Sequence, residues 1–141
     1  MSDCIFCKII NGALPSSKVY EDDDVLAFLD IGQVTKGHTL IIPKVHQENM
    51  YELTPEVAEK VFRVVPKVAN ALKAQFNPIG LNMLSNTGEA AGQSVFHLHV
   101  HLIPRYDEKD DGFGLKWHAD MDKYSQEELQ GFAKAIADKI E

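Results

Sequence analysis

The sequence contains no apolar run that approaches the roughly 18 residues of a membrane-spanning helix. Its first residues, Met1 to Cys4, carry neither the basic region nor the apolar core of a secretory signal peptide. We therefore expect a cytoplasmic protein with no membrane partner. The length of 141 residues and the ordinary composition predict one globular domain, residues 1–141.

Basic residues are scarce: 14 Lys and Arg stand against 21 Asp and Glu, which gives a formal net charge of −7. Phosphate contacts dominate the binding of nucleic acids, so we expect no nucleic acid polymer as a partner. The sequence also lacks a Walker-type phosphate loop. A small phosphate-bearing ligand remains compatible with this charge, because a few local donors suffice to hold it.

Cysteine is nearly absent, and both copies lie in the C-x-x-C motif of Cys4 and Cys7. In a reducing compartment such a motif is a metal pair or a redox pair, and a thioredoxin-like redox motif needs a preceding strand. No room for that strand exists before Cys4, so metal is favoured. Two histidines would complete a tetrahedral site, and His46 and His97 are the candidates. The long sequence separations between the cysteines and these histidines differ from those of a zinc finger, so spacing alone does not decide whether the four residues form a metal site.

Three of the six histidines, His97, His99 and His101, alternate with apolar residues. Side chains two apart share one face of a strand. This pattern predicts a strand over residues 93–104 with a row of imidazoles on one face and an apolar face toward the core. The apolar face consists of Phe96, Leu98, Val100 and Leu102.

An imidazole can act as a base, an acid, a nucleophile or a metal ligand. A polar strand face without a function is the plainest alternative. A hydrolytic metalloenzyme that uses His97, His99 and His101 as ligands is another. On a straight strand these three residues would spread over about 13 Å, which is too far for one ion.

The remaining pattern predicts an α+β fold with an antiparallel five-stranded sheet, a central helix and a C-terminal helix. Besides the histidine-rich strand, we expect a short helix or turn and four strands. Thr54 and Pro55 begin the central helix, which Pro66 should kink, and the capping box at Ser125 begins the last. The short helix or turn lies at 4–11, and the strands at 19–20, 25–28, 38–43 and 81–84.

Two segments read as loops. Residues 85–93 are small and polar, which fits either a hairpin turn or a loop whose backbone N–H groups approach an anion. The polar run after Arg105, with Gly112 and Gly114, predicts a mobile connection. His118 falls near its end, and we expect it at the surface.

The segment His97–Ile103 reads His-x-His-x-His-x-x with apolar x, and it resembles the histidine-triad (HIT) family. The similarity covers roughly residues 4–106 and is closest to the Hint-like branch, including bacterial Hit proteins with a C-x-x-C motif. It implies the HIT-like fold. The further matching positions are Phe28–Ile31, Gly37, His38, Ile42–Lys44, His46, Asn86 and Gly92–Ser94.

The resemblance implies a homodimer that binds purine nucleotides and cleaves a bond at the α-phosphorus. By matching position, His99 is the nucleophile and forms a nucleotidyl-histidine intermediate. His101 lies on the phosphate oxygens, His38 completes the histidine cluster, and Ser94 faces the bridging or leaving atom.

The same resemblance assigns the binding residues. Asp30 matches the carboxylate that holds the ribose hydroxyls. The apolar slot for the base matches Ile5, Phe6, Ile9, Phe28 and Ile31. The phosphate contacts match Asn86, Gly92, Gln93 and Ser94, together with His99 and His101.

In zinc-bearing members of the family, the first histidine of the triad joins two cysteines and a further histidine. The matching positions are Cys4, Cys7, His46 and His97, which implies a structural zinc without an open position for substrate. Two functions follow from the whole pattern. The first is a nucleoside phosphoramidate or nucleotidyl hydrolase, and the alternative is a nucleotide-binding regulatory or docking module with only residual catalysis.

Overall fold

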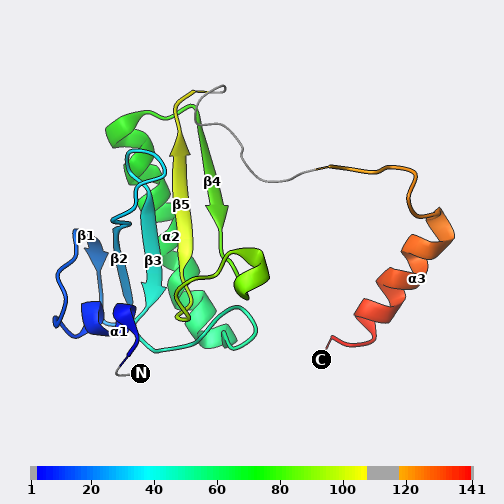
Figure 1. The fold of residues 1–141 in the computed structure, drawn as a ribbon, viewed down its shortest axis with the longest axis horizontal. Coiled ribbons are helices and arrows are strands. Elements are labelled where there is room, and N and C mark those ends of the chain that lie inside the picture. Colours follow the sequence, from blue (N-terminus) through cyan, green and yellow to red (C-terminus); the bar gives the residue numbers. More distant parts are fainter. Residues whose placement is uncertain (1–2, 108–117, 141) are drawn as a thin grey trace.

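The computed structural model describes residues 3–107 and 118–140, and five of their strands form one antiparallel sheet (Figure 1). The order across the sheet is β1-β2-β3-β5-β4. This arrangement confirms the predicted α+β fold class. The strands are β1 Lys18–Glu21, β2 Val25–Leu29, β3 Thr39–Pro43, β4 Gly80–Leu84 and β5 Val100–Arg105.

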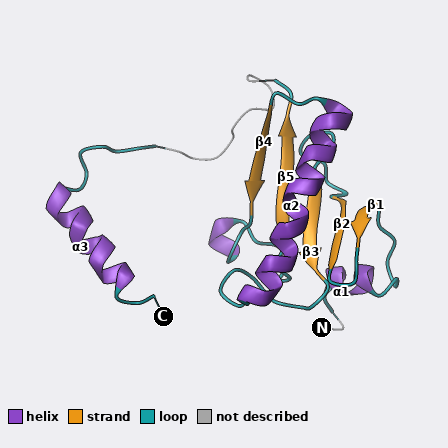
Figure 2. Cartoon of the chain, turned by 180° about the vertical axis from the view of Figure 1, so that it is seen from behind, coloured by secondary structure: helices purple, strands orange, loops and turns teal. Residues whose placement is uncertain are grey.

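The central helix α2, Pro55–Phe76, lies across one face of the sheet (Figure 2). It begins as predicted, because the Thr54 side chain accepts a hydrogen bond from the Val57 N–H and Pro55 occupies the first turn. The helix continues through Pro66 and ends at Asn77, which adopts the left-handed conformation.

The sheet has two apolar faces because side chains alternate along each strand. Val25, Ala27, Ile41, Val100 and Leu102 pack with buried valines of α2. On the other face, Phe6 of the short helix α1, Ile5–Ile10, packs with Leu26, Phe28, Leu40 and Ile42. Leu40 pairs with His101 in the ladder between β3 and β5, so this second face also carries the histidines.

Strand β5 begins at Val100, so the prediction of a strand from Gln93 was wrong at that end. The Leu98 N–H donates to the Gln47 carbonyl instead of to β3, at 2.6 Å. The carbonyl of Pro43, the last residue of β3, accepts a hydrogen bond from the His97 side chain at 2.8 Å. Leu98 is buried as predicted, but Phe96, predicted on the same apolar face, is 38% exposed, and His97 and His99 are buried as well.

The C-terminal helix α3, Gln126–Ala137, begins with the predicted capping box at Ser125. It lies apart from the sheet (Figure 1), and every described residue from 118 to 140 is exposed, including His118 as predicted. The predicted mobile connection falls mainly on residues 108–117, outside the described residues. Within the described ranges, no helix is long and apolar enough to span a membrane.

Gly37, which precedes His38, adopts a φ of +96° against the C-terminal end of α2. A Cβ there would lie 3.2 Å from side-chain atoms of Leu72 and Phe76. Gly37→Ala should therefore lower the free energy of unfolding by about 2–3 kcal/mol in urea denaturation, since strain and overlap add.

Gly12 is the matched control, because it also has a positive φ, of +84°, but a Cβ there meets nothing within 4 Å. Gly12→Ala should cost only the backbone strain, about 1 kcal/mol. Equal losses in the two variants would contradict the role of the helix contact.

Candidate functional site

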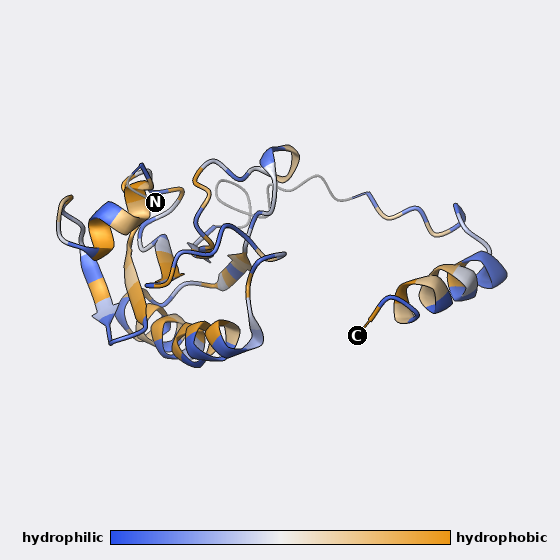
Figure 3. Ribbon diagram, turned by 90° about the horizontal axis from the view of Figure 1, so that it is seen from below, coloured by the Kyte–Doolittle hydropathy of each residue, from blue (hydrophilic) through white to orange (hydrophobic). Residues whose placement is uncertain are grey.

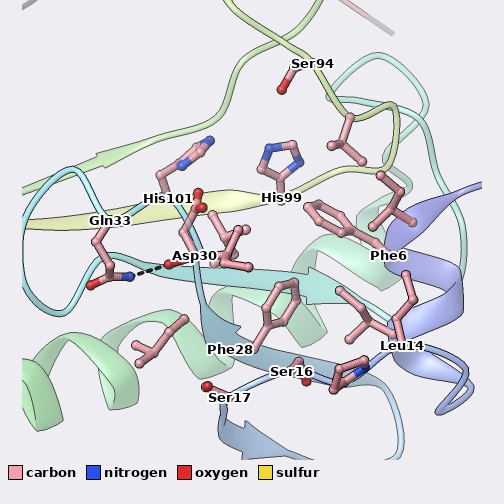
Figure 4. Close-up of a pocket in the computed structure, with 17 residues that line it drawn as sticks. Phe6, Leu14, Ser16, Ser17, Phe28, Asp30, Gln33, Ser94, His99 and His101 are labelled. Atoms are coloured by element: carbon pink, nitrogen blue, oxygen red, sulfur yellow. Dashed lines mark hydrogen bonds between the residues drawn. The ribbon is translucent and has the colours of Figure 1, made fainter.

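A pocket of about 860 Å³ opens on the face of the sheet that carries α1 (Figure 4). Its walls are mainly apolar, with a few polar groups at one end, as is usual for small-molecule sites. Many of the residues assigned from the family resemblance line it. They are Ile5, Phe6, Ile9, Phe28, Asp30, Ile31, Ser94, His99 and His101.

His99 lines this pocket although its side chain is almost entirely buried. Its Nδ1 lies 2.7 Å from the backbone carbonyl of His97, so Nδ1 carries the proton and donates it. The lone pair is therefore on Nε2. The ring of Phe6 packs edge-on against the imidazole, with 5.1 Å between centroids. This arrangement holds a neutral imidazole in one tautomer and one orientation.

His101 belongs to a chain of hydrogen bonds that runs back into the protein. The Val34 N–H donates to His38 Nδ1 at 3.2 Å, which leaves the proton of His38 on Nε2. His38 Nε2 then donates to His101 Nδ1 at 2.9 Å. His101 consequently carries its proton on Nε2 and can act as a hydrogen-bond donor.

Burial keeps these histidines neutral. It lowers the pKa of His38 and of His99, with nearby Asp30 opposing the shift in both cases. Burial, followed by repulsion from His99 and His38, lowers the pKa of His101 to about 4. A neutral imidazole can attack phosphorus as a nucleophile or donate a hydrogen bond to a phosphate oxygen.

Asp30 follows β2 and lies beneath His101 in the pocket (Figure 4). Its Oδ1 accepts the Gly32 N–H at 2.8 Å, and its Oδ2 lies 3.6 Å from His38 Nε2. That second distance is too long for a hydrogen bond. Asp30, His38 and His101 also have potential metal-ligand atoms within 4.8 Å of one another, but the two imidazoles are hydrogen-bonded to each other.

The loop before the histidines is held by its own side chains. The Asn86 amide donates to the Gly92 carbonyl at 3.3 Å. The buried Gln93 amide accepts from the Gly88 N–H and donates to the Glu48 and Val95 carbonyls. Of the four phosphate residues predicted here, only Ser94 lines the pocket, where it faces His99 and His101 (Figure 4).

The four candidate metal ligands converge, although up to 93 residues separate them. His97 Nδ1 lies 3.4 Å from Cys4 Sγ and 3.6 Å from Cys7 Sγ. His46 Nδ1 lies 3.4 Å from Cys7 Sγ and 3.2 Å from His97 Nδ1. His97 thus faces the cysteines while His99 and His101 face the pocket, so the three rings of the triad do not converge on one point.

The chemistry of this group fits zinc. Bonds of about 2.0–2.3 Å in a tetrahedron separate the ligand atoms by roughly 3.3–3.8 Å, close to the four distances just given. His97 Nε2–H donates a hydrogen bond to the Pro43 carbonyl, which leaves Nδ1 without a proton and able to bind a metal. Burial lowers the pKa of His97 to about 4, so the imidazole stays uncharged, and both cysteines are free thiols.

Several pocket residues were missed by the sequence analysis. The segment Leu14–Ser17 forms part of the wall, and Gln33, Leu40 and Val95 contribute elsewhere. Leu14–Ser17 follows the turn at Gly12 and has no periodicity, so nothing in the sequence connected it with a site. Its position depends on how α1 packs on the sheet.

These features define a class of protein: an α+β domain with three histidines in alternation, two of which line a pocket. Comparison with known proteins agrees, because the HIT domain family matches residues 11–108. The chain is 60% identical to Protein hit of Bacillus subtilis, over 98% of this chain and 94% of that protein. It is 40% identical to the adenosine 5'-monophosphoramidase hnt1 of Schizosaccharomyces pombe, over 97% and 98% of the two chains. The chain belongs to the HIT family.

Solved structures agree with the fold. A HIT family protein from Bacillus anthracis superposes with a TM-score of 0.95 at 60% identity, covering 99% of this chain and 98% of that one. A zinc-bound histidine triad family protein from Mycobacterium smegmatis superposes with a TM-score of 0.72 at 35% identity, covering 99% of each chain. HIT relatives thus include a phosphoramidase and a zinc protein.

Proposed function

We propose that this protein is a purine nucleotide-binding hydrolase that cleaves at the α-phosphorus of a nucleoside phosphoramidate or a related nucleotide. The observation that carries this proposal is the setting of His99. Its Nδ1–H donates a hydrogen bond to the His97 carbonyl, and its ring lines the pocket. The monophosphoramidase activity of the fission yeast relative points in the same direction.

The reaction has two displacements. His99 Nε2 attacks the α-phosphorus, a P–N bond forms, and the bond to the leaving amine or alkoxide breaks as that group takes up a proton from solvent. Water then attacks the nucleotidyl-histidine and gives a proton back to solvent, the electron pair of the P–N bond returns to His99 Nε2, and a nucleoside monophosphate leaves. A nitrogen nucleophile divides one difficult displacement into two easier ones.

The neighbouring groups supply position and charge stabilisation, which phosphoryl transfer mainly requires. His101 donates its Nε2 proton to a phosphate oxygen, and His38 fixes the tautomer of His101. Ser94 faces the leaving atom from the opposite wall. Asn86, Gly92 and Gln93 support this wall through the hydrogen bonds of the loop.

The other end of the pocket receives the nucleoside. The base enters the apolar slot between α1 and β2, where Phe6 and Phe28 pack edge to face at 5.5 Å. Asp30 Oδ2 then accepts hydrogen bonds from the ribose hydroxyls. The slot is lined by Ile5, Phe6, Ile9, Phe28 and Ile31.

Asp30→Asn should lower kcat/KM for a ribonucleotide substrate by about 10- to 100-fold, because hydrogen bonds to a charged group contribute about 1.5–3 kcal/mol. Steady-state kinetics with an adenosine phosphoramidate measures this loss. The amide can still accept from the Gly32 N–H, so the local turn is preserved.

The control is the matching substrate without ribose hydroxyls. Wild-type protein should use it poorly, and Asp30→Asn should cost little more with it, since the two changes remove the same contact. An equal loss with both substrates would place the role of Asp30 elsewhere.

We propose a structural zinc on Cys4, Cys7, His46 and His97. The distances between their ligand atoms and the zinc-bound relative support it. The four side chains fill a tetrahedral shell, so zinc at this position supplies cross-linking of α1 to the sheet rather than an open coordination position.

We also propose that the protein acts as a homodimer. Helix α3 is amphipathic (Figure 3), and its apolar side chains Leu129, Phe132 and Ile136 are 49%, 47% and 64% exposed in a single chain. An exposed apolar stripe of this kind favours burial against another protein surface. A second copy of the chain is the partner consistent with the homodimer that the family resemblance implies.

Mass spectrometry of a rapidly quenched reaction tests the proposed function. Mixing the protein with excess adenosine phosphoramidate should give a burst of protein carrying one covalent nucleotidyl group on His99, followed by steady release of AMP. Tight purine-nucleotide binding without a covalent species and without turnover would instead establish a binding module that docks on a partner.

A further inference from the structure

The zinc group and the nucleotide pocket share structural elements, although their ligand sets differ. The side chain of His97 is part of the zinc group, and its backbone carbonyl contacts the proposed nucleophile, His99. Its imidazole faces Cys4 and Cys7, while its carbonyl accepts a hydrogen bond from His99 Nδ1–H at 2.7 Å. A shift of His97 therefore changes the orientation of His99 directly.

Helix α1 provides the second connection. Cys4 caps it and Cys7 lies within it, while Ile5, Phe6 and Ile9 form a wall of the pocket. A helix of 6 residues is far shorter than one that is stable alone. Its position depends on packing and on whatever anchors its two cysteines.

Phe6 joins the two connections. Its ring packs edge-on against His97 at 5.9 Å between centroids and against His99 at 5.1 Å. It is also a buried member of the apolar cluster on this face of the sheet. Movement of α1 away from the sheet would open the base slot and loosen both imidazoles together.

We infer that His97 and α1 couple the metal group to the pocket, so that zinc raises nucleotide affinity and nucleotide raises zinc affinity by the same factor. The inference rests on the proposed nucleotide and zinc sites. The physical basis is conformational entropy: when zinc has already ordered the wall of the pocket, nucleotide binding no longer carries the free-energy cost of ordering it. Linkage makes the effect reciprocal. His97 is then a positioning residue for His99.

AMP affinity measured by calorimetry tests the coupling without turnover. AMP should bind about tenfold more weakly to zinc-stripped protein than to zinc-loaded protein, a typical coupling factor. Nitrogen-15 NMR of the histidines should show the fixed Nδ1–H tautomer of His99 in the loaded form and a mixture of tautomers in the stripped form. Unchanged affinity and an unchanged tautomer in a folded, stripped protein would overturn the inference.

His46 offers the sharper variant, because it belongs to the zinc group and does not line the pocket. His46→Ala should weaken AMP binding about as much as stripping does. His46→Cys, which restores a four-ligand set, should recover both zinc and AMP affinity. AMP affinity that stays at the wild-type value in His46→Ala without zinc, or stays weak in His46→Cys with zinc, contradicts the coupling.

A further measurement uses only folded wild-type protein, in case metal loss unfolds the chain. Zinc is partitioned at equilibrium between the protein and a chelator of known affinity, at chelator concentrations that leave the circular dichroism of the protein unchanged. AMP should raise the zinc affinity measured in this way about tenfold. An unchanged zinc affinity would overturn the inference. The covalent-intermediate experiment on loaded protein stands separately, so either proposal can fail without the other.

Discussion

Replacing His99 by asparagine is expected to reduce turnover by about four orders of magnitude while the protein stays folded and still binds AMP. The side-chain amide of asparagine can donate to the His97 carbonyl as Nδ1 does. It has no lone pair that can attack phosphorus. His99→Asn thus separates the nucleophile from the hydrogen bond that positions it.

Three measurements check this prediction. Turnover of an adenosine phosphoramidate gives the rate, urea denaturation gives the stability, and calorimetry should show an AMP affinity within about fivefold of wild type. His118→Ala is the matched control, since His118 is exposed and lies outside the pocket and the zinc group. Appreciable turnover by His99→Asn would end the nucleotidyl-histidine mechanism.

The local elements were predictable because each has a short-range cause. Thr54 with Pro55 and the capping box at Ser125 mark the starts of α2 and α3, and both starts are confirmed. The turn between β1 and β2 follows from acidic residues that hydrogen-bond their own backbone, as Asp22 does with Asp24 and Val25. No long-range contact is needed for these features.

The start of β5 was not predictable, because it is decided by groups far away in sequence. Period-2 alternation continues in any extended backbone, whether or not a neighbouring strand pairs with it. The Gln47 carbonyl accepts a hydrogen bond from the Leu98 N–H, and the Pro43 carbonyl at the end of β3 accepts one from the His97 side chain. The alternation therefore predicted the burial of Leu98, Val100 and Leu102 but not the residue at which the ladder begins.

The candidate site shows the same division. The pattern of histidines, and the family resemblance built on it, predicted several of the side chains that line the pocket, but Asn86, Gly92 and Gln93 do not line it. The sequence does not show that the Gln93 amide is already hydrogen-bonded at both ends, to backbone groups of Gly88, Val95 and the distant Glu48. Nor does it place Leu14–Ser17 in the wall, because that depends on the packing of α1.

Wild-type stability should fall steeply as the pH drops from about 6.5 to about 4, and His101 should account for about 3 kcal/mol of the fall. Its pKa is about 4 in the fold, well below its ordinary value near 6.5, chiefly because the ring is buried. His99 and His38 face it and lower the pKa further, while Asp30 opposes them.

The sign follows from proton binding. Between these two pKa values the unfolded chain holds a proton on this residue and the folded chain does not. Acid therefore favours unfolding, and the contribution of His101 is complete above pH 6.5 and lost as the pH falls through 4. The His101→Gln side chain can still accept from His38 Nε2 but does not titrate.

Urea denaturation of wild type and His101→Gln, in identical buffers from pH 8 to pH 4, isolates this share. The metal ligands and the carboxyl groups away from His101 are common to both proteins, so their effects cancel in the difference. The stability advantage of wild type at pH 7 should shrink by about 3 kcal/mol at pH 4. A difference that stays constant with pH would show that the fold does not lower the pKa of His101, so that burial would not keep this ring neutral between pH 4 and pH 6.5.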